Sequence, residues 1–308
     1  MKIVVMGTGG TGGYYGALLA GRANDVTFVA RGEHLAAIRR AGLQVKSVLG
    51  DFTLSPANAT DDPSGLSEPD LILFCTKTYD TDQAARQIEP IVGKSTSVLS
   101  LQNGIDAAER IGRVVGMEHI IGGATWISSA VEAPGVIHHV SGFRRVVMGE
   151  LDGRRTPRLQ AIQDAFQDAG VEAEASDDIL KVLWTKFLFI SPTSSFGSLT
   201  RLPAAAYRAV PETRRQIVRL MREIEAVARS QGAALDADVV EQTLAFMDGA
   251  ASNIRTSMQL DVESGHASEI ESMLGVIGRK GRAAGVDTPL ADALYALLLP
   301  VELHARGE

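Results

Sequence analysis

The stretch IVVMGTGGTGGYYG, residues 3–16, joins a short β-branched run, a glycine-rich turn and a helix-compatible segment. Dinucleotide-binding α/β units use these three parts in this order. Gly7 allows the tight turn, Gly9 lets the backbone approach a pyrophosphate, and Gly12 lets the helix lie close to the strand. The free N–H groups and the positive dipole end of the helix then face the phosphates. The predicted phosphate-binding residues are Gly7, Thr8, Gly9, Gly10, Thr11 and Gly12.

The same glycine pattern also occurs in an ordinary turn between a strand and a helix, but the strand before it favours the binding interpretation. The next strand, residues 25–31, ends where NAD-specific sites place an Asp or Glu that holds the ribose 2′-hydroxyl. This chain has Arg31 there, and a guanidinium suits a 2′-phosphate. We therefore expect NADP(H) as the cofactor. Glu33 favours NAD instead, and a surface arginine without a binding role is the alternative.

Length and composition narrow the class of protein. A chain of 308 residues is at the upper limit of a single core, which predicts two domains. The formal charge of −7 argues against nucleic acid or an anionic membrane as the main partner. The chain lacks a membrane-length apolar run and enters its first strand too directly for a signal peptide, and its one cysteine, Cys75, suits a reducing compartment. We expect a cytoplasmic protein, and the histidines show no metal-ligand spacing with the cysteine.

Residues 1–176 alternate short apolar runs with helical segments, which is typical of a parallel, doubly wound sheet. Lys77 and Asn103 each follow the end of a predicted strand. Because ligands bind at the carboxyl ends of strands in such sheets, both side chains are expected to face the cofactor. Three further strands are expected at an extended or partly antiparallel edge of the sheet, over residues 120–126, 135–140 and 145–149.

Residues 177–308 show helical periodicity without a strand pattern and predict an all-helical domain. Asp177 or Asp178 can cap its first helix, which we expect Pro192 to interrupt before an irregular segment over residues 194–197. Ser268 and Glu271 have the spacing of a capping box. A final helix starts at Thr288-Pro289. The residues of that helix expected to pack inward are Leu290, Leu294, Leu297 and Leu298.

Lys186 is the one charged residue between Val182 and Ile190, and its neighbours in that segment, apart from Thr185, are apolar or aromatic. Lysine is almost never fully buried without a partner. Its ammonium therefore either reaches a cleft or pairs with a carboxylate. The alternative is a lysine that extends along the exposed face of an amphipathic helix.

Several motifs together resemble those of the ketopantoate reductase (2-dehydropantoate 2-reductase) family in order and spacing, over nearly the whole chain. The motifs are Gly7-x-Gly9-x-x-Gly12, Arg31, Thr76-Lys77, Gln102-Asn103-Gly104, Trp184-x-Lys186, Thr256-Ser257-Met258-x-x-Asp261 and Ser268-Glu269-Ile270. The resemblance implies an α/β fold with an N-terminal Rossmann-type doubly wound sheet, residues 1–176, and an all-helical C-terminal domain, residues 177–308. A cleft between the two domains is expected.

The resemblance also implies roles for particular residues. Lys186 would donate the proton to the substrate carbonyl oxygen as hydride arrives from NADPH. Lys77 and Asn103 would line the nicotinamide and substrate cleft, and Ser257 would hold the substrate carboxylate. Glu269 would contact the nicotinamide ribose and the lysine. The chemistry agrees with these roles, because hydride delivery to a ketone produces an alkoxide that a fixed ammonium can stabilise and protonate.

Two positions depart from the family pattern. Family members that act on ketopantoate usually have an asparagine where this chain has Ile190, and another where it has Ala204. A site without those amides should accept a less hydroxylated or bulkier acid. The expected substrate-binding residues are Asn103, Lys186, Ile190 and Ser257, and the expected catalytic residues are Lys186 and Glu269.

The sequence thus predicts an NADPH-dependent reductase of a 2-oxo acid. One alternative is a non-catalytic NADP(H)-binding sensor, for which a proton donor beside a carboxylate would serve no purpose. Another is a dehydrogenase of a different alcohol or of an imine on the same scaffold. The oligomeric state, a homodimer included, stays open.

Overall fold

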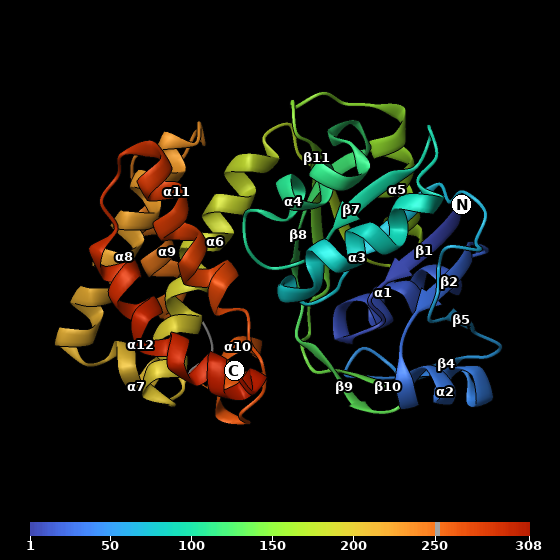
Figure 1. Ribbon diagram of the computed structural model, residues 1–308, viewed down its shortest axis with the longest axis horizontal. Coiled ribbons are helices and arrows are strands. Elements are labelled where there is room, and N and C mark those ends of the chain that lie inside the picture. The colour runs from blue at the N-terminus through green and yellow to red at the C-terminus, as the bar shows by residue number, and fades with distance from the viewer. Residues whose placement is uncertain (250–252) are drawn as a thin grey trace. The chain divides into compact units, whose positions relative to one another are not determined.

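The computed structural model describes residues 1–249 and 253–308 and divides into two compact units. Unit 1 comprises Met1–Gln102 and Ala107–Ile179, and unit 2 comprises Asn103–Asp106 and Leu180–Glu308. The short segment Asn103–Asp106 therefore belongs to unit 2, although it directly follows a strand and a turn of unit 1. Figure 1 traces the chain through both units.

Unit 1 is built on an eight-stranded sheet in the order β12-β11-β8-β7-β6-β1-β2-β5, in which only the pairing of β11 with β8 is antiparallel. Its strands are β1 (Lys2–Met6), β2 (Asp25–Val29), β5 (Asn58–Thr60), β6 (Leu71–Phe74), β7 (Ser97–Ser100), β8 (Ile120–Trp126), β11 (Arg145–Glu150) and β12 (Glu172–Ala175). The predicted doubly wound parallel sheet with an antiparallel pairing near one edge is confirmed.

The helices of unit 1 cover both faces of this sheet. They are α1 (Gly10–Ala20), α2 (Gly32–Ala41), α3 (Thr81–Ile88), α4 (Ala107–Val115) and α5 (Pro157–Asp168). Along β1, Ile3 and Val5 pack into a core with α1 and α5, whereas Val4 and Met6 pack into a second core with α3 and α4. Alternate side chains of a strand point to opposite faces, so a continuous apolar run is the pattern of a strand buried on both sides.

A second, four-stranded sheet in unit 1 corrects one expectation. Residues 135–140 were assigned to the edge of the main sheet, but their strand lies in a separate sheet with the order β4-β3-β10-β9. Its strands are β3 (Leu43–Ser47), β4 (Phe52–Leu54), β9 (Ser129–Ala133) and β10 (Val136–His139). This sheet packs against the start of α1, because a Cβ at Gly10 would lie 2.3 Å from the carbonyl oxygen of Ser129 and one at Gly13 would lie 2.7 Å from Ile137.

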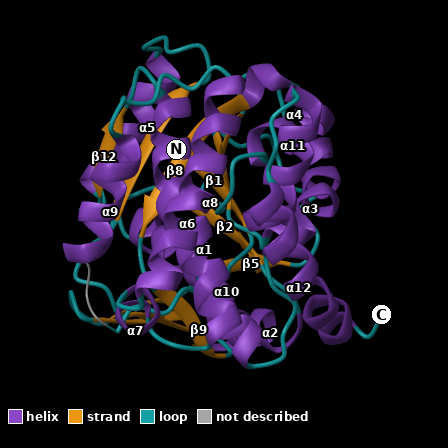
Figure 2. Cartoon of the chain, turned by 90° about the vertical axis from the view of Figure 1, so that its left-hand side faces the viewer, coloured by secondary structure: helices purple, strands orange, loops and turns teal. Residues whose placement is uncertain are grey.

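Unit 2 is helical, and its described residues contain no strand. Figure 2 draws the helices of the chain in purple and the strands in orange. The helices of unit 2 are α6 (Ile179–Thr200), which begins at the last residue of unit 1, α7 (Ala204–Arg208), α8 (Pro211–Ser230), α9 (Val239–Gly249), α10 (Ser257–Glu263), α11 (Val276–Ala284) and α12 (Pro289–Arg306). A π-helical turn, Glu271–Gly275, precedes α11. None of the helices in the described part of the chain is long and apolar enough to cross a membrane.

Helix α6 runs without interruption through Pro192, so the predicted break at that residue is wrong. Proline removes one backbone donor from a helix interior. Here Pro192 is buried, and the residues on both sides of it pack into the helical core. Hydroxyl groups nearby supply donors to the helix backbone: Thr193 Oγ1 donates to Phe189 O and Ser195 Oγ to Ser191 O, both at 2.7 Å. Tertiary packing therefore overrides the local preference of the proline.

Two smaller expectations in unit 2 are also wrong. Ser268 and Glu271 form no capping box: the turn that begins at Glu271 has no side-chain cap, and the Oγ of Ser268 donates to the carboxylate of Glu302 on α12 at 2.6 Å. A charged acceptor makes a stronger hydrogen bond than a backbone or neutral group does. Leu297 on α12 is 63% exposed, since the buried stripe of that helix passes through Leu294 and Leu298.

Candidate active site

The glycine-rich turn of unit 1 has the geometry expected of a phosphate-binding turn. Gly7 has φ +96°, and a Cβ there would lie 2.7 Å from the backbone nitrogen of Thr76. A Cβ on Gly12 would lie 2.2 Å from the carbonyl oxygen of Gly7. By contrast, a Cβ on Gly9, at the N-cap of α1, would meet nothing within 4 Å. Gly7 and Gly12 are therefore needed by the fold, whereas Gly9 faces open space.

Thr8 differs from its neighbours in the turn because its side chain has a structural partner. It is buried, and its Oγ1 donates to the carbonyl oxygen of Val29 at 2.9 Å. Its backbone N–H donates to the same oxygen at 3.1 Å. Both hydrogen bonds attach the turn to the end of β2. The Thr8 side chain thus positions the turn beside the start of α2.

Arg31 lies at the N-cap of α2, two residues after β2 ends. Its side chain is exposed, and its guanidinium donates to Oε1 of Gln87 on α3 at 3.2 Å. A neutral amide is a weaker partner than a carboxylate. The guanidinium therefore stays able to bind an anion.

Lys77 follows the carboxyl end of β6, and the buried side chain of Gln102 fixes the loop around it. Nε2 of Gln102 donates to the carbonyl oxygen of Thr76 and to Oγ1 of Thr81, each at 2.9 Å. These hydrogen bonds tie the loop after β6 to the loop after β7. Gln102 thus holds the half-buried Lys77 at the edge of the sheet where ligands of parallel sheets bind.

Three of the predicted site residues come together in unit 2. Nζ of Lys186, on α6, donates to Oδ1 of Asn103 at 3.1 Å. The buried carboxylate of Glu269 acts electrostatically on the same ammonium. An amide and a carboxylate thus surround the ammonium of Lys186. The sequence left open whether Lys186 has polar partners or extends along an exposed helix face. In the structure Lys186 is half-buried and has polar partners.

The surroundings of Lys186 change its acidity. Burial, which disfavours the charged form, lowers the pKa of Lys186 to about 8, and the negative charge of Glu269 opposes that shift. Near neutral pH the side chain is therefore still mostly protonated but gives up its proton more readily than an ordinary lysine. A pKa close to the working pH is what general acid catalysis requires.

Ser268, the residue before Glu269, is held by Glu302, which the sequence analysis missed. The backbone N–H and the Oγ of Ser268 donate to the carboxylate of Glu302 on α12, at 2.8 and 2.6 Å, and Arg306 Nε donates to it at 2.7 Å. Glu302 is only 5% exposed, and a buried carboxylate is unfavourable without partners. These three donors compensate its charge. The signal was available, since Glu302 is a lone carboxylate in the apolar run LLLPVEL, residues 297–303.

The remaining predicted residues of unit 2 lie on α6, α7 and α10. Ile190 is half-buried on α6, one helical turn beyond Lys186. Ser257 is the exposed first residue of α10, and a Cβ at Gly197 would lie 2.4 Å from Gln259, so α10 packs closely against the second half of α6. Ala204 is 2% exposed and belongs to the helical core. Its side chain therefore faces the interior of unit 2.

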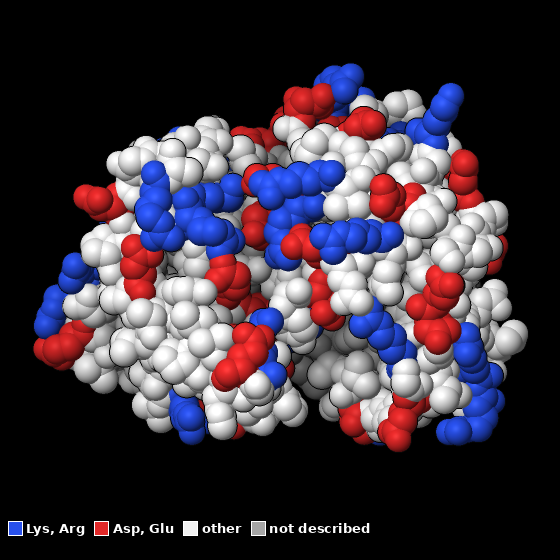
Figure 3. Space-filling view, in the orientation of Figure 1, with Lys and Arg blue, Asp and Glu red and all other residues white. Residues whose placement is uncertain are grey.

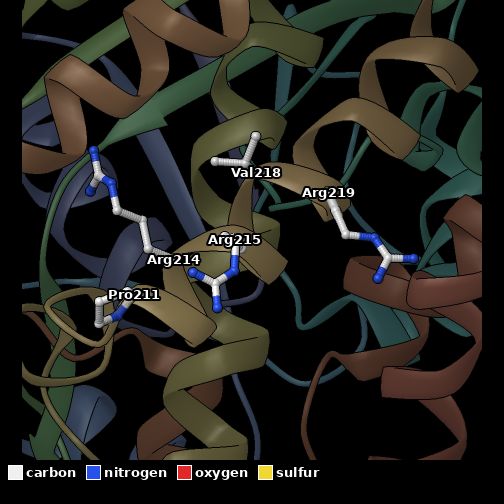
Figure 4. Close-up of a pocket in the computed structure, with 5 residues that line it drawn as sticks. All are labelled: Pro211, Arg214, Arg215, Val218 and Arg219. Atoms are coloured by element: carbon white, nitrogen blue, oxygen red, sulfur yellow. The ribbon is translucent and has the colours of Figure 1, made fainter.

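Unit 2 also has a shallow hollow on its surface, and none of the residues that line it is a predicted site residue. The hollow follows α8 and is lined by Pro211, Arg214, Arg215, Val218 and Arg219 (Figure 4). The guanidinium groups point in different directions, and those of Arg214 and Arg215 pair with Asp248 and Glu212. Acidic and basic side chains are interspersed over the face of the molecule in Figure 3. The hollow contains none of the predicted site residues, and its arginines form a solvated helix face.

The strand order, the glycine turn and the all-helical second unit define a Rossmann-type α/β protein with a helical C-terminal part. The family model described as "Ketopantoate reductase PanE/ApbA" matches residues 3–153, and the model for the C-terminal part of the same family matches residues 178–302. The chain belongs to the ketopantoate reductase family. The resemblance noted in the sequence is thereby confirmed, and the family is one of oxidoreductases.

Known proteins agree with this assignment. A 2-dehydropantoate 2-reductase of Nostoc sp. is 31% identical over 299 residues, which cover 96% of this chain and 93% of the relative. A PanE/ApbA family ketopantoate reductase from Ralstonia eutropha JMP134 has a TM-score of 0.91 and 30% identity, with 99% of this chain and 100% of the other covered. A D-mandelate dehydrogenase solved with NADH has a TM-score of 0.87 and 25% identity, with 100% and 99% covered.

Proposed function

We propose that this protein reduces a 2-oxo acid to a 2-hydroxy acid with NADPH, with Lys186 as the general acid. The observation that carries the proposal is the setting of Lys186 in unit 2. Its half-buried ammonium donates to Asn103 and lies in the field of Glu269, with a pKa of about 8. A proton donor of this kind is what carbonyl reduction needs and what a purely binding protein does not need.

The residues of unit 1 suit a dinucleotide. The open space beside Gly9, at the positive end of α1, leaves room for a pyrophosphate against the backbone N–H groups. Arg31, exposed just after β2, would bind the 2′-phosphate, which favours NADPH over NADH. The D-mandelate dehydrogenase solved with NADH supports a nicotinamide cofactor for this fold. Lys77 would contact the cofactor from the carboxyl edge of the sheet.

Side chains of unit 2 would stabilise the developing charge and supply the proton for carbonyl reduction. The chemistry that NADPH would supply when bound is a hydride for the carbonyl carbon of the substrate. Lys186 stabilises the charge that develops on the carbonyl oxygen and gives it a proton. Asn103 orients the ammonium through its hydrogen bond, and the negative charge of Glu269 favours the charged form of Lys186, against the effect of burial. Ser257, exposed at the start of α10, would hold the substrate carboxylate together with backbone N–H groups of that helix.

The side chain of the preferred substrate should be apolar. Ile190 lies one turn beyond Lys186 and offers no hydrogen bond to a hydroxyl group of the substrate. A buried hydroxyl without a partner costs about 1–3 kcal/mol, which corresponds to roughly ten- to hundred-fold in kcat/KM. We therefore propose a branched or aromatic 2-oxo acid as a better substrate than ketopantoate.

The experiment that tests the proposed function is a measurement of NADPH oxidation against a panel of 2-oxo acids, which includes ketopantoate and apolar branched and aromatic acids, and against a set of imines. Saturable turnover of at least one acid, with equimolar 2-hydroxy acid formed, is expected. Tight NADPH binding without turnover of any acid would instead indicate the sensor, and turnover of imines alone would indicate a different dehydrogenase.

A further inference from the structure

We infer that Ser191 is a positioning residue of the proposed active site: its hydroxyl holds the π-helical turn that sets Glu269 and Asn103 against Lys186. Ser191 is fully buried on α6, five residues after Lys186. Its Oγ donates to the carbonyl oxygen of Met273 at 2.7 Å. This inference rests on the proposed function, but its geometry is independent of the substrate.

The partner of Ser191 lies in an unusual piece of backbone. In the turn Glu271–Gly275, the N–H of Val276 donates to the carbonyl oxygen of Glu271, five residues earlier, instead of to one four residues earlier. A π-helical turn of this kind contains one extra residue and is less stable than α-helix, and such turns are frequent at functional sites. The hydroxyl of Ser191 supplies a donor from another helix to a carbonyl within the turn. It therefore stabilises the π-helical form.

The same turn contacts both partners of Lys186. Glu269 stands two residues before the turn, and its carbonyl oxygen accepts from the N–H of Met273 at 3.0 Å. On the other side, a Cβ at Gly104 would lie 3.3 Å from the carbonyl oxygen of Ser272, so the backbone next to Asn103 rests on the turn. A change in the turn would thus move the carboxylate and the amide together.

Without the Ser191 hydroxyl, the turn can relax toward regular α-helix. Loss of the extra residue would rotate the residues before the turn by about 100° relative to those after it, because each residue of an α-helix turns by that angle. Val276 and Ile277 at the start of α11 are buried in the helical core, which resists their rotation. Glu269 would therefore move, and its carboxylate would lie farther from the ammonium of Lys186.

Because Glu269 is charged, its displacement should change the pKa of Lys186, which can be measured. Glu269 is the charge that raises the pKa of Lys186, whereas Asn103 is neutral. The other acidic groups on the elements beside it, Glu271 in the turn and Asp106 after Asn103, both pair with Arg279 on α11. Ser191 has no charge, so its replacement can change the proton affinity of Lys186 only through the positions of other groups.

The test measures how fast Lys186 in the full-length protein reacts with trace acetic anhydride as a function of pH, with the product quantified by mass spectrometry. The variants are Ser191→Ala and, as the matched control, Ser195→Ala. Ser195 is a serine of the same helix, equally buried, whose Oγ donates within α6. In parallel, kcat is measured across pH on the best 2-oxo acid of the panel.

We expect Ser191→Ala to move the midpoint of Lys186 labelling to lower pH, to move the alkaline limb of kcat in the same direction, and to lower kcat by about ten- to hundred-fold, as small misplacements of catalytic groups do. Ser195→Ala should leave both midpoints unchanged. If Ser191→Ala does not fold, Ser191→Cys, which keeps the size but donates weakly, should give a smaller shift in the same direction. A folded variant with the wild-type midpoint would overturn the inference. A shifted midpoint in a protein that reduces no 2-oxo acid would support the inference and reject the proposed function.

Discussion

The Nζ atom of Lys186 and the Oδ1 atom of Asn103 lie 3.1 Å apart, although 83 positions separate the two residues. The segment Asn103–Asp106 leaves the sheet of unit 1 and joins the helical unit 2, and this brings the amide to the lysine. The hydrogen bond that Nζ donates to Asn103 fixes the direction of the ammonium. The proposed proton donor is thus oriented by a residue that the sequence predicted to line the nicotinamide and substrate cleft, without indicating its hydrogen bond to the lysine.

Replacement of Lys186 by methionine should separate stability from function. Burial lowers the pKa of Lys186, so the charged form of this side chain destabilises the folded state at neutral pH. The unfolded chain binds this proton more tightly than the folded one, and the side chain contributes unfavourably below its ordinary pKa. We expect Lys186→Met to lower kcat by about 10²–10⁴, while its denaturation midpoint at pH 7 is equal to or above that of the wild type. A large loss of stability would indicate that the ammonium is a structural group.

Glu269→Gln should change the pH dependence of kcat. The carboxylate of Glu269 raises the pKa of Lys186, so its removal lowers that pKa further below the value of about 8. Reduction needs the protonated lysine, and the alkaline limb of the kcat profile should therefore move to lower pH in the variant. The profile of wild-type and variant protein on the same acid checks this. Coincident limbs would mean that Glu269 does not act on the proton donor.

Two glycines of the same turn should respond differently to alanine. Gly9→Ala places a methyl group in open space at φ −81°, so the free energy of unfolding should stay close to that of the wild type. The same methyl group would occupy the position proposed for the pyrophosphate, and NADPH should bind at least about ten-fold more weakly. Gly12→Ala should instead destabilise the fold, because the new Cβ would lie 2.2 Å from the carbonyl oxygen of Gly7. Thermal unfolding and cofactor titration of both variants test this contrast, which NADPH binding to Gly9→Ala at wild-type affinity would contradict.

Arg31→Ala should weaken NADPH binding selectively. A charge-assisted hydrogen bond to the 2′-phosphate is worth about 1.5–3 kcal/mol, so the Kd for NADPH should rise by roughly ten- to hundred-fold while that for NADH changes little. Gln87→Ala, which removes the side chain that accepts from Arg31, is the matched control and should retain the preference for NADPH. Equal losses for both cofactors in Arg31→Ala would show that the arginine is structural.

The substrate prediction is best tested at Ile190. Ile190→Asn should raise kcat/KM on ketopantoate relative to an apolar 2-oxo acid, because an amide one turn beyond Lys186 can hydrogen-bond a substrate hydroxyl. Ala204→Asn is a different case, since Ala204 is 2% exposed in the helical core and an amide there should mainly destabilise unit 2. Wild-type protein that already prefers ketopantoate strongly would contradict the prediction.

The parts of the fold that the sequence predicts well are those where one local signal agrees with the tertiary structure. The apolar run before the glycine-rich turn forms β1 as predicted, and the predicted helix start at Thr288-Pro289 agrees with α12. The small sheet was missed because β4 has only three residues and β9 is exposed at all but its first residue, so their patterns resemble that of a loop. The continuity of α6 through Pro192 depends on burial, which no local pattern encodes.

The candidate site shows the same division. Lys186 and Glu302 are recognisable in the sequence because each is a charge in an apolar run. The contacts of Ser191 with Met273 and of Ser268 with Glu302 join residues 82 and 34 positions apart, and they depend on how the helices of unit 2 pack. A serine in a helix carries no signal for the acceptor that it will meet. Such positioning contacts therefore require the structure.

The most direct test of the central claim is the kcat of Lys186→Ala on the best 2-oxo acid with saturating NADPH, measured together with the Kd for NADPH. The account predicts that kcat falls by about 10²–10⁴, the usual contribution of a placed general acid, while the Kd stays close to that of the wild type. Wild-type kcat in this variant would contradict the account, because the proton would then reach the carbonyl oxygen without Lys186.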